Sequence, residues 1–302
     1  MNQRIDPKSL APGLAFAILL FGIESACLAQ KSLAWKFTKN RIVDVLVEQD
    51  TKMKLDGLTP SKPTVNDINT IQKTNLTWTI QDIRKDGSVA VEQAISRIVL
   101  EMKSPAANFV LDTNDNKPLT GIGESIAKEI RPMAGARFVV NMRPTGEVID
   151  INIPDDLAKK LNASGLAETG FREIAINSSL QLPATPIVVG DAWENQYELD
   201  MRVFGTLTIR TTYQYLGGEV VSGITLDKIS ATTSMRAIDS NDSSAIKLAK
   251  QESTGTIWFN NTSGCIDHSA FQQEMALNVK QADIQLKQVV KQELRLKFAP
   301  RP

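Results

Sequence analysis

Apolar and polar residues alternate with a period of two through most of the chain, and this alternation constrains the fold more than any other feature. The first long example covers residues 43–55. Its apolar members Val43, Val45, Val47, Met53 and Leu55 share one face, and its charged members Asp44, Glu48, Asp50, Lys52 and Lys54 share the other, where only Leu46 interrupts them. Successive side chains of a strand point to opposite faces, so a long strand with one face in a core and one in water is predicted.

The same alternation recurs along the rest of the chain. It covers residues 76–80, 89–99, 138–153, 207–215, 224–235, 255–264 and 284–298. Turn sequences such as Asp86-Gly87 separate several of these segments. The two halves of the chain also share an order of features: a Trp (Trp35, Trp193), an aromatic-bearing strand, a turn glycine (Gly87, Gly223) and a long strand. This order predicts a degenerate internal repeat.

We therefore expect a mainly β fold (α+β) with two related halves of long, curved antiparallel sheet. The halves would form a half-barrel or a sandwich, with a few short helices that cover or plug them. The expected boundaries are a signal peptide over residues 1–29, an N-terminal β-rich half over 30–182 and a C-terminal β-rich half over 183–302. Helices are predicted at residues 123–130, 154–161, 166–180 and 243–250, and a surface loop at 58–69, which contains Pro60 and Pro63.

The N-terminus has the features of a secretory signal. Arg4 and Lys8 precede an apolar run at residues 14–23, and small residues at 25–29 predict cleavage after Ala29. Ten helical residues span about 15 Å, half of a ~30 Å hydrocarbon core, so a transmembrane span is not expected. A buried N-terminal helix is one alternative. Lipoprotein anchoring through Cys27 is another, which Glu24 disfavours because an aliphatic residue is required there. We expect an exported protein, periplasmic or extracellular.

Composition argues against several classes of function. Lys plus Arg and Asp plus Glu number 34 each, so the net charge is zero and the basic surface of a nucleic-acid binder is not indicated. One histidine, His268, and two cysteines, Cys27 and Cys265, leave little material for a histidine-based active site or a zinc site. We therefore expect no cofactor, no metal, no catalytic residue and no enzymatic activity. Cleavage after Ala29 would leave Cys265 unpaired, so packing must supply the stability.

His268 and Cys265 are the two residues whose chemistry could suggest catalysis. His268 lies between Asp267 and Ser269, and strand alternation would point it away from both, so these three are not expected to form a relay. We expect a surface or edge-strand histidine. Cys265 follows a turn glycine, and a reactive thiol needs a nearby base or a helix N-terminus to lower its pKa. We expect a small, half-buried residue there.

Two other segments suggest ion or polymer binding. Asp112, Asn114 and Asn116 occupy the first three ligand positions of a calcium loop, but the sixth position is Lys117 and the twelfth is Gly123. An Asx-rich turn is therefore expected. Residues 280–297 are rich in Lys and Gln, with the charges mainly on one face. A solvated strand face is expected there, and a surface for anionic envelope polymers is the alternative.

Residues 182–193, LPATPIVVGDAW, form the most distinctive stretch. Its prolines favour an extended entry, Gly190-Asp191 a tight turn, and Trp193 brings a large apolar ring to a core. The pattern LP-x-x-P-x-x-x-GD-x-W resembles that of a family of exported bacterial proteins, common in planctomycetes, which is defined as a domain of unknown function. Short stretches at residues 33–37, 144–148, 205–213 and 255–264 share the resemblance. It implies export and a similar fold, and it brings no catalytic residue; Asn260 replaces an Asp that is usual in the family.

These observations lead to a non-enzymatic exported protein that binds an apolar or amphipathic, lipid-like ligand in a β half-barrel, whose concave face can enclose an apolar cavity. By analogy of fold alone, such sheets resemble periplasmic carriers of lipids or lipoproteins. The first alternative is a structural or interaction module of the cell envelope, with an envelope protein as partner. The second is a hydrolase, which would need His268 or a cluster of acidic residues in a cleft.

Overall fold

The protein is one large, curved antiparallel sheet. The computed structural model describes residues 30–59, 62–162, 171, 174–176, 178–201, 205–237, 246–281 and 284–301, so the expected signal peptide lies outside the described residues. Within these ranges twelve strands form a sheet that does not close into a barrel. The strands are β1 (Ile42–Thr59), β2 (Lys62–Ile83), β3 (Val89–Lys103), β4 (Asn108–Asp112), β5 (Arg137–Met142), β6 (Val148–Asn152), β7 (Ala192–Met201), β8 (Gly205–Val221), β9 (Ile224–Ala237), β10 (Ile246–Asn260), β11 (Cys265–Gln281) and β12 (Ile284–Pro300).

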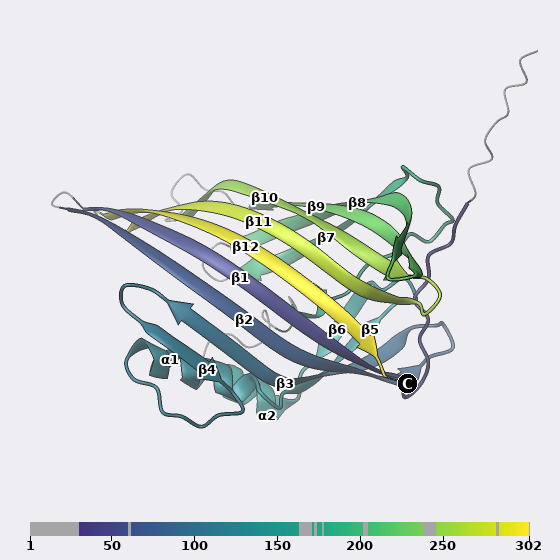
Figure 1. Cartoon of the computed structure of the whole chain (residues 1–302), viewed down its shortest axis with the longest axis horizontal. Coiled ribbons are helices and arrows are strands. Elements are labelled where there is room, and N and C mark those ends of the chain that lie inside the picture. Colours follow the sequence, from purple (N-terminus) through teal and green to yellow (C-terminus); the bar gives the residue numbers. More distant parts are fainter. Residues whose placement is uncertain are drawn as a thin grey trace, which may run out of the picture.

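The first and last strands of the chain lie side by side at the centre of the sheet. The strand order is β6-β5-β3-β2-β1-β12-β11-β10-β9-β8-β7, and β4 pairs with β3 outside this path. The strands of the N-terminal half therefore lie on one side of the β1–β12 pair, and those of the C-terminal half on the other. Figure 1 shows β1 and β12 nearest the viewer, with β5–β6 and β7–β8 farther back. The expected mainly β fold of long curved sheet is confirmed, and its form is an open half-barrel.

The alternation seen in the sequence gives the sheet one face whose apolar side chains form the main core and one face with charged side chains. Trp78 (2% exposed), Phe259 (0%) and Phe298 (4%) point into the main core from β2, β10 and β12. Trp35 joins them: its ring centroid lies 6.3 Å from that of Trp78 and 5.6 Å from that of Phe259. Because a half-barrel exposes its inner face, other segments must cover these rings, and residues 30–41 and 178–191 do so at one end of the sheet.

Backbone and side-chain hydrogen bonds hold these two covering segments in place. Lys31 and Ile187 form an antiparallel bridge with N–O distances of 2.8 and 2.9 Å. The Trp35 indole donates to the Leu180 carbonyl at 2.8 Å. Gly146 lies against both groups, and its φ of +88° belongs to the left-handed region that favours glycine, so the turn at residues 143–146 closes this end.

The helices are short, as expected. α1 (Ile122–Ile130) and α2 (Asp155–Asn162) match two predicted helices, and the 3-10 turn η1 (Arg131–Met133) follows α1 at Pro132. Of the predicted helix at 166–180, residues 174–176 are helical and most of the remainder lies outside the described residues. Among the described helices, none is both long and apolar enough to cross a membrane.

Two sequence predictions were wrong. The predicted helix at 243–250 is strand from Ile246 onwards, because β10 pairs with β11 from Ile246 opposite Val279. The predicted loop at 58–69 is a hairpin: β1 continues to Thr59, which pairs with Lys62, and Pro63 pairs in register with Leu58. In both places long-range pairing overrides a local signal, since a proline near the start of a strand does not prevent pairing farther along it. Residues 60, 61 and 243–245 lie outside the described residues.

Candidate ligand-binding site

The concave face is defined here as the face of β1, β2 and β7–β12 that includes the core residues. Directly opposed residues of antiparallel strands share a face, so the strand registers extend the concave face beyond the core. Beyond Val47 in β1 it continues through Gln49, Thr51, Met53 and Leu55. In each neighbouring strand, the residues that pair with these positions, and every second residue from them, also belong to the concave face.

A row of uncharged polar residues crosses the concave face, one from each of eight strands. Each member pairs in register with the next: Thr70 with Thr51, Thr51 with Gln292, Gln292 with Gln273, Gln273 with Ser253, Ser253 with Thr233, Thr233 with Thr211, and Thr211 with Asn195. We call this row the polar belt. All eight residues are half-buried, so their side chains remain accessible from the concave side. The Thr211 and Thr233 hydroxyl oxygens lie 2.9 Å apart, which confirms their shared face.

Rows that are mostly apolar flank the polar belt on both sides. Two residues nearer the core, the register contains Leu294, Phe271, Gly255, Ala231, Tyr213 and Trp193 in β7–β12, whereas β1 and β2 place the polar Gln49 and Gln72 there. Two residues farther from the core, it contains the apolar residues Ile68, Met53, Val290, Met275, Met235, Ile209 and Tyr197, while β10 places the polar Gln251 at this level. We call this second set the distal row. Ile209 is buried and the others are half-buried, so the distal row forms an apolar surface that the described residues cover only partly.

Charge is strongly segregated between the two faces. From the polar belt through the distal row, the described residues of the concave face include no Asp, Glu, Lys or Arg. The opposite face of the same strands is rich in them: Glu48, Asp50, Lys52, Lys73, Glu252, Glu274, Lys291, Glu293, Arg295 and Lys297. Neighbours of opposite sign pair there, as Lys73 does with Glu48 at 2.6 Å. The convex face of the described residues is thus a solvated surface, as expected for the part of residues 280–297 whose side chains are described, residues 286–297.

A buried carboxylate, Asp227, lies on the concave side of the core, and a lysine ammonium compensates its charge. Asp227 of β9 is 1% exposed; it accepts hydrogen bonds from the Lys31 ammonium at 2.6 Å and from the Tyr215 hydroxyl at 2.7 Å. Burial, with the Asp227 carboxylate beside it, raises the pKa of Tyr215, so that hydroxyl remains a donor. This ion pair also ties residues 30–41 to β9.

His268 is on the convex face of β11 with its side chain 32% exposed, so the surface position is the one of the two expected positions that the structure has, and β11 is an interior strand. Its ring stacks on Trp258 with centroids 4.3 Å apart. Its Nδ1 lies 2.7 Å from Asp267 Oδ2, a contact that regular alternation would forbid. A register shift between Trp258 and Phe259 makes it possible, because Asp267 is the extra residue of a bulge. Ser269 is buried on the concave side, so the three residues do not form a relay.

Cys265 is more deeply buried than expected. The side chain is 4% exposed, and burial raises the pKa of its thiol to about 11. A thiol with a raised pKa is a poor nucleophile at neutral pH, so the described surroundings of Cys265 favour a packing role.

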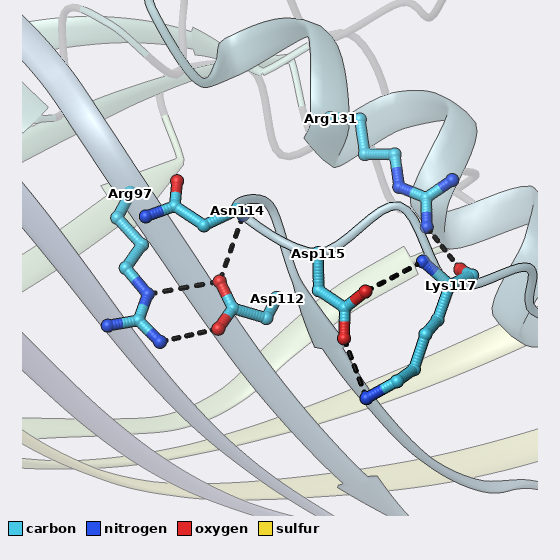
Figure 2. A network of polar contacts seen from close by, with 6 residues as sticks. All are labelled: Arg97, Asp112, Asn114, Asp115, Lys117 and Arg131. Carbon is cyan, nitrogen blue, oxygen red and sulfur yellow. Dashed lines mark hydrogen bonds and ion pairs between the residues drawn. The ribbon is translucent and has the colours of Figure 1, made fainter.

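The calcium-loop candidate is an Asx-rich turn, as expected (Figure 2). Asp112 accepts two hydrogen bonds from the Arg97 guanidinium, and the Asn114 N–H donates to it at 3.0 Å. Arg97 is the main reason that the pKa of Asp112 falls to about 2. Asp115 is paired with Lys117 at 2.8 Å. Both carboxylates thus have cationic partners already, and within the described residues no group of three potential metal ligands gathers.

Two pockets of about 380 and 430 Å³ lie away from the concave face. One lies between α1 and residues 118–119, and the other beside the start of β1 at residues 38–42. Neither contains a residue of the polar belt or the distal row.

Comparison with known proteins shows a likeness of fold. No family model and no curated protein matches the chain. Among solved structures it is similar to lipovitellin, in a structure concerned with lipid–protein interactions: the TM-score is 0.50 and the identity 14% over 88% of this chain. The match covers 26% of the lipovitellin chain, so this chain spans about a quarter of that protein's length.

Two further structures match with lower scores. An outer membrane channel from Pseudomonas putida F1 has a TM-score of 0.21 at 7% identity, over 88% of this chain and 97% of the channel. A protein from Desulfovibrio piger ATCC 29098, of a family of unknown function, has a TM-score of 0.15 at 8% identity, over 82% of this chain and 83% of that one. At these scores the two structures carry no information on the function of this chain.

Sequence reasoning missed the polar belt. Each member was visible as a polar residue on a strand face that also contains apolar residues, such as Thr51, which lies with Gln49 between Val47 and Met53. That signal could not show that eight strands place such a residue at the same level, because their relative registers come from the pairing alone.

Proposed function

We propose that this is an exported, non-enzymatic protein that binds an apolar or amphipathic ligand along its concave face. The observation that carries the proposal is the segregation of charge: eight strands place charged side chains on the convex face and uncharged ones on the concave face beyond the core. Removing an ion from water is costly. An apolar molecule that binds to such an uncharged surface removes no ion from water, so its binding avoids this cost. A half-covered apolar surface of this kind is typical of a binding site.

The energetics favour an apolar ligand. Each 100 Å² of apolar surface removed from water contributes roughly 2.5 kcal/mol. Met53, Val290 and Met275 of the distal row lie side by side in register on three central strands. Methionine side chains are unbranched and flexible, so Met53 and Met275 can adapt to acyl chains of varying shape. A ligand that covers this row would therefore gain affinity without a specific polar contact.

The likeness to lipovitellin supports the same proposal. The lipovitellin structure concerns lipid–protein interactions, and its fold resembles this sheet over 88% of the present chain. The signal-like N-terminus and the resemblance to exported bacterial proteins support an extracytoplasmic location.

The test is the binding of the neutral dye Nile red to the full chain, together with mass spectrometry of lipids extracted from the purified protein. Met275→Asp places a charge in the distal row, and Gln272→Asp places the same charge on the exposed convex face of the same strand. We expect Met275→Asp to weaken dye binding at least about tenfold, because an ion then has to be desolvated or left facing the ligand, and Gln272→Asp to leave it unchanged. Equal effects of the two variants, or no dye binding and no co-purified lipid, would contradict the proposal.

An interaction module is the second candidate, and a specific surface favours it. At the end of the β8–β9 hairpin, Leu216, Val220 and Ile224 are 43%, 71% and 50% exposed. Val189, 55% exposed, lies against Gly217 of the same hairpin. The register pairs Val220 with Thr225 and Val221 with Ile224, so Val220 and Ile224 point to opposite faces of the hairpin end. A projecting hairpin end with apolar side chains on both faces suits insertion into a protein partner. This function predicts the opposite result in the dye assay: no binding by the unaltered protein.

A further inference from the structure

We infer that the polar belt recognises an uncharged hydrogen-bonding group, an ester, within a ligand that is apolar on both sides of it. The ligand class is a neutral lipid such as a wax ester or an acylglycerol, in preference to a free fatty acid or a plain hydrocarbon. This inference rests on the proposed function and specifies its ligand.

The order of the rows carries the inference. A ligand that lies along the strands meets, in turn, the row of Leu294 and Phe271, then the polar belt, then the distal row with Val290 and Met275. Neighbouring rows are two residues apart on each strand, or about 7 Å. In β11 and β12 the polar zone is therefore one residue deep, with apolar residues about 7 Å away on either side, whereas in β1 and β2 it extends to Gln49 and Gln72. Such a profile matches a single polar group between two hydrocarbon parts.

Two amides at the centre of the belt are available for this role. Gln273 and Gln292 are opposite each other in β11 and β12, and both are half-buried. Among the described residues neither amide is joined to a hydrogen-bond partner, whereas Thr211 and Thr233 bond to each other and Gln251 bonds to the backbone of Met235 and Thr233. A primary amide donates two hydrogen bonds, and an ester carbonyl can only accept them, so the two groups are complementary.

The absence of charge in the described belt defines what it selects against. A carboxylate placed at this level would find amide and hydroxyl donors but no Lys or Arg on the described concave face, so its charge would stay uncompensated. A hydrocarbon would leave the Gln273 and Gln292 amides desolvated without partners, which also costs affinity. An ester satisfies the amides and carries no net charge.

The test compares three ligands by displacement of Nile red from the full chain: oleyl oleate, squalene and oleate. For the unaltered protein we expect oleyl oleate to bind about tenfold more tightly than either of the others, the effect of one or two net hydrogen bonds. The double variant Gln273→Leu with Gln292→Leu should lose this preference for the ester over squalene. Gln272→Leu, on the convex face next to Gln273, should keep it.

The outcomes separate this inference from the function on which it rests. Failure of all three ligands to displace Nile red, or no Nile red binding at all, would contradict the proposed function itself. Binding of squalene as tight as that of oleyl oleate would overturn the inference and leave the function standing. Tightest binding of oleate, or an ester preference that survives the double leucine variant, would overturn it as well. Circular dichroism and the thermal midpoint of each variant establish that it is folded.

Discussion

Lys31→Met is expected to destabilise the protein by removing the cation from a buried ion pair. The Asp227 carboxylate is 1% exposed and its partners are the Lys31 ammonium at 2.6 Å and the Tyr215 hydroxyl at 2.7 Å. Without Lys31 the carboxylate keeps the hydroxyl alone. A lost hydrogen bond to a buried charged group costs about 1.5–3 kcal/mol. Because the Lys31 side chain is itself 36% exposed, water replaces part of the interaction, and we expect about 2 kcal/mol.

The assay is thermal and urea unfolding of the full chain. A loss of about 2 kcal/mol corresponds to a fall of roughly 4 °C in Tm for a protein of this size. Adding Asp227→Asn should recover more than half of that loss, since the neutral amide no longer needs a cation and the two positions are directly coupled. The matched control is Lys39→Met, which removes the same charge from the exposed pair of Lys39 and Asp82 at 3.4 Å.

Lys31 and Lys39 should therefore contribute unequally to stability. Lys39→Met should leave Tm unchanged within error, because solvated surface pairs contribute little. If Lys31→Met and Lys39→Met had the same effect on stability, the buried pair of Lys31 and Asp227 would contribute no more than an exposed surface pair. If the losses from Lys31→Met and Asp227→Asn simply added, the two side chains would not be coupled.

Two further predictions concern other contacts. Gly255→Ala should destabilise the protein by about 1–3 kcal/mol and weaken Nile red binding, because the new methyl group would overlap the ring of Phe271 on the concave face. Urea unfolding measures the change in stability, and dye titration measures the change in binding. Thr256→Ala, on the convex face, is the control for both measurements. Asp112→Asn should lower the urea midpoint at pH 7, since the ionised carboxylate pairs with Arg97. The pKa of Asp112 is held at about 2, below its ordinary value of 3.8, so this stabilisation is complete above about pH 4 and is lost as the pH falls through 2. The midpoints of the two proteins should therefore converge at low pH, and a constant difference would exclude Arg97–Asp112 pairing as the cause.

Much of the fold could be predicted from the sequence because a strand's two faces are encoded locally. The alternation at residues 43–55 correctly placed Val43 and Val45 in the core and Asp44 and Glu48 on the solvated face. The helices near residues 123–130 and 154–161 were also predictable, since Pro132, Pro154 and adjacent acidic residues mark their ends. Local signals failed where a distant strand decided the outcome, as at residues 246–250, which pair with β11.

The sequence by itself determined that the chain forms long strands with one apolar face. Only the tertiary structure decided which residues of different strands lie at the same level. Hydrogen bonding between strands fixes that register over distances of more than two hundred residues, as it does for Thr51 opposite Gln292. It also placed the Asp267 bulge beside His268 and set Gln273 and Gln292 of the polar belt between apolar residues of the flanking rows. The period of two in the sequence shows which face of a strand a residue occupies. Only the pairing of the strands shows which residues of other strands lie beside it, and a binding surface depends on both.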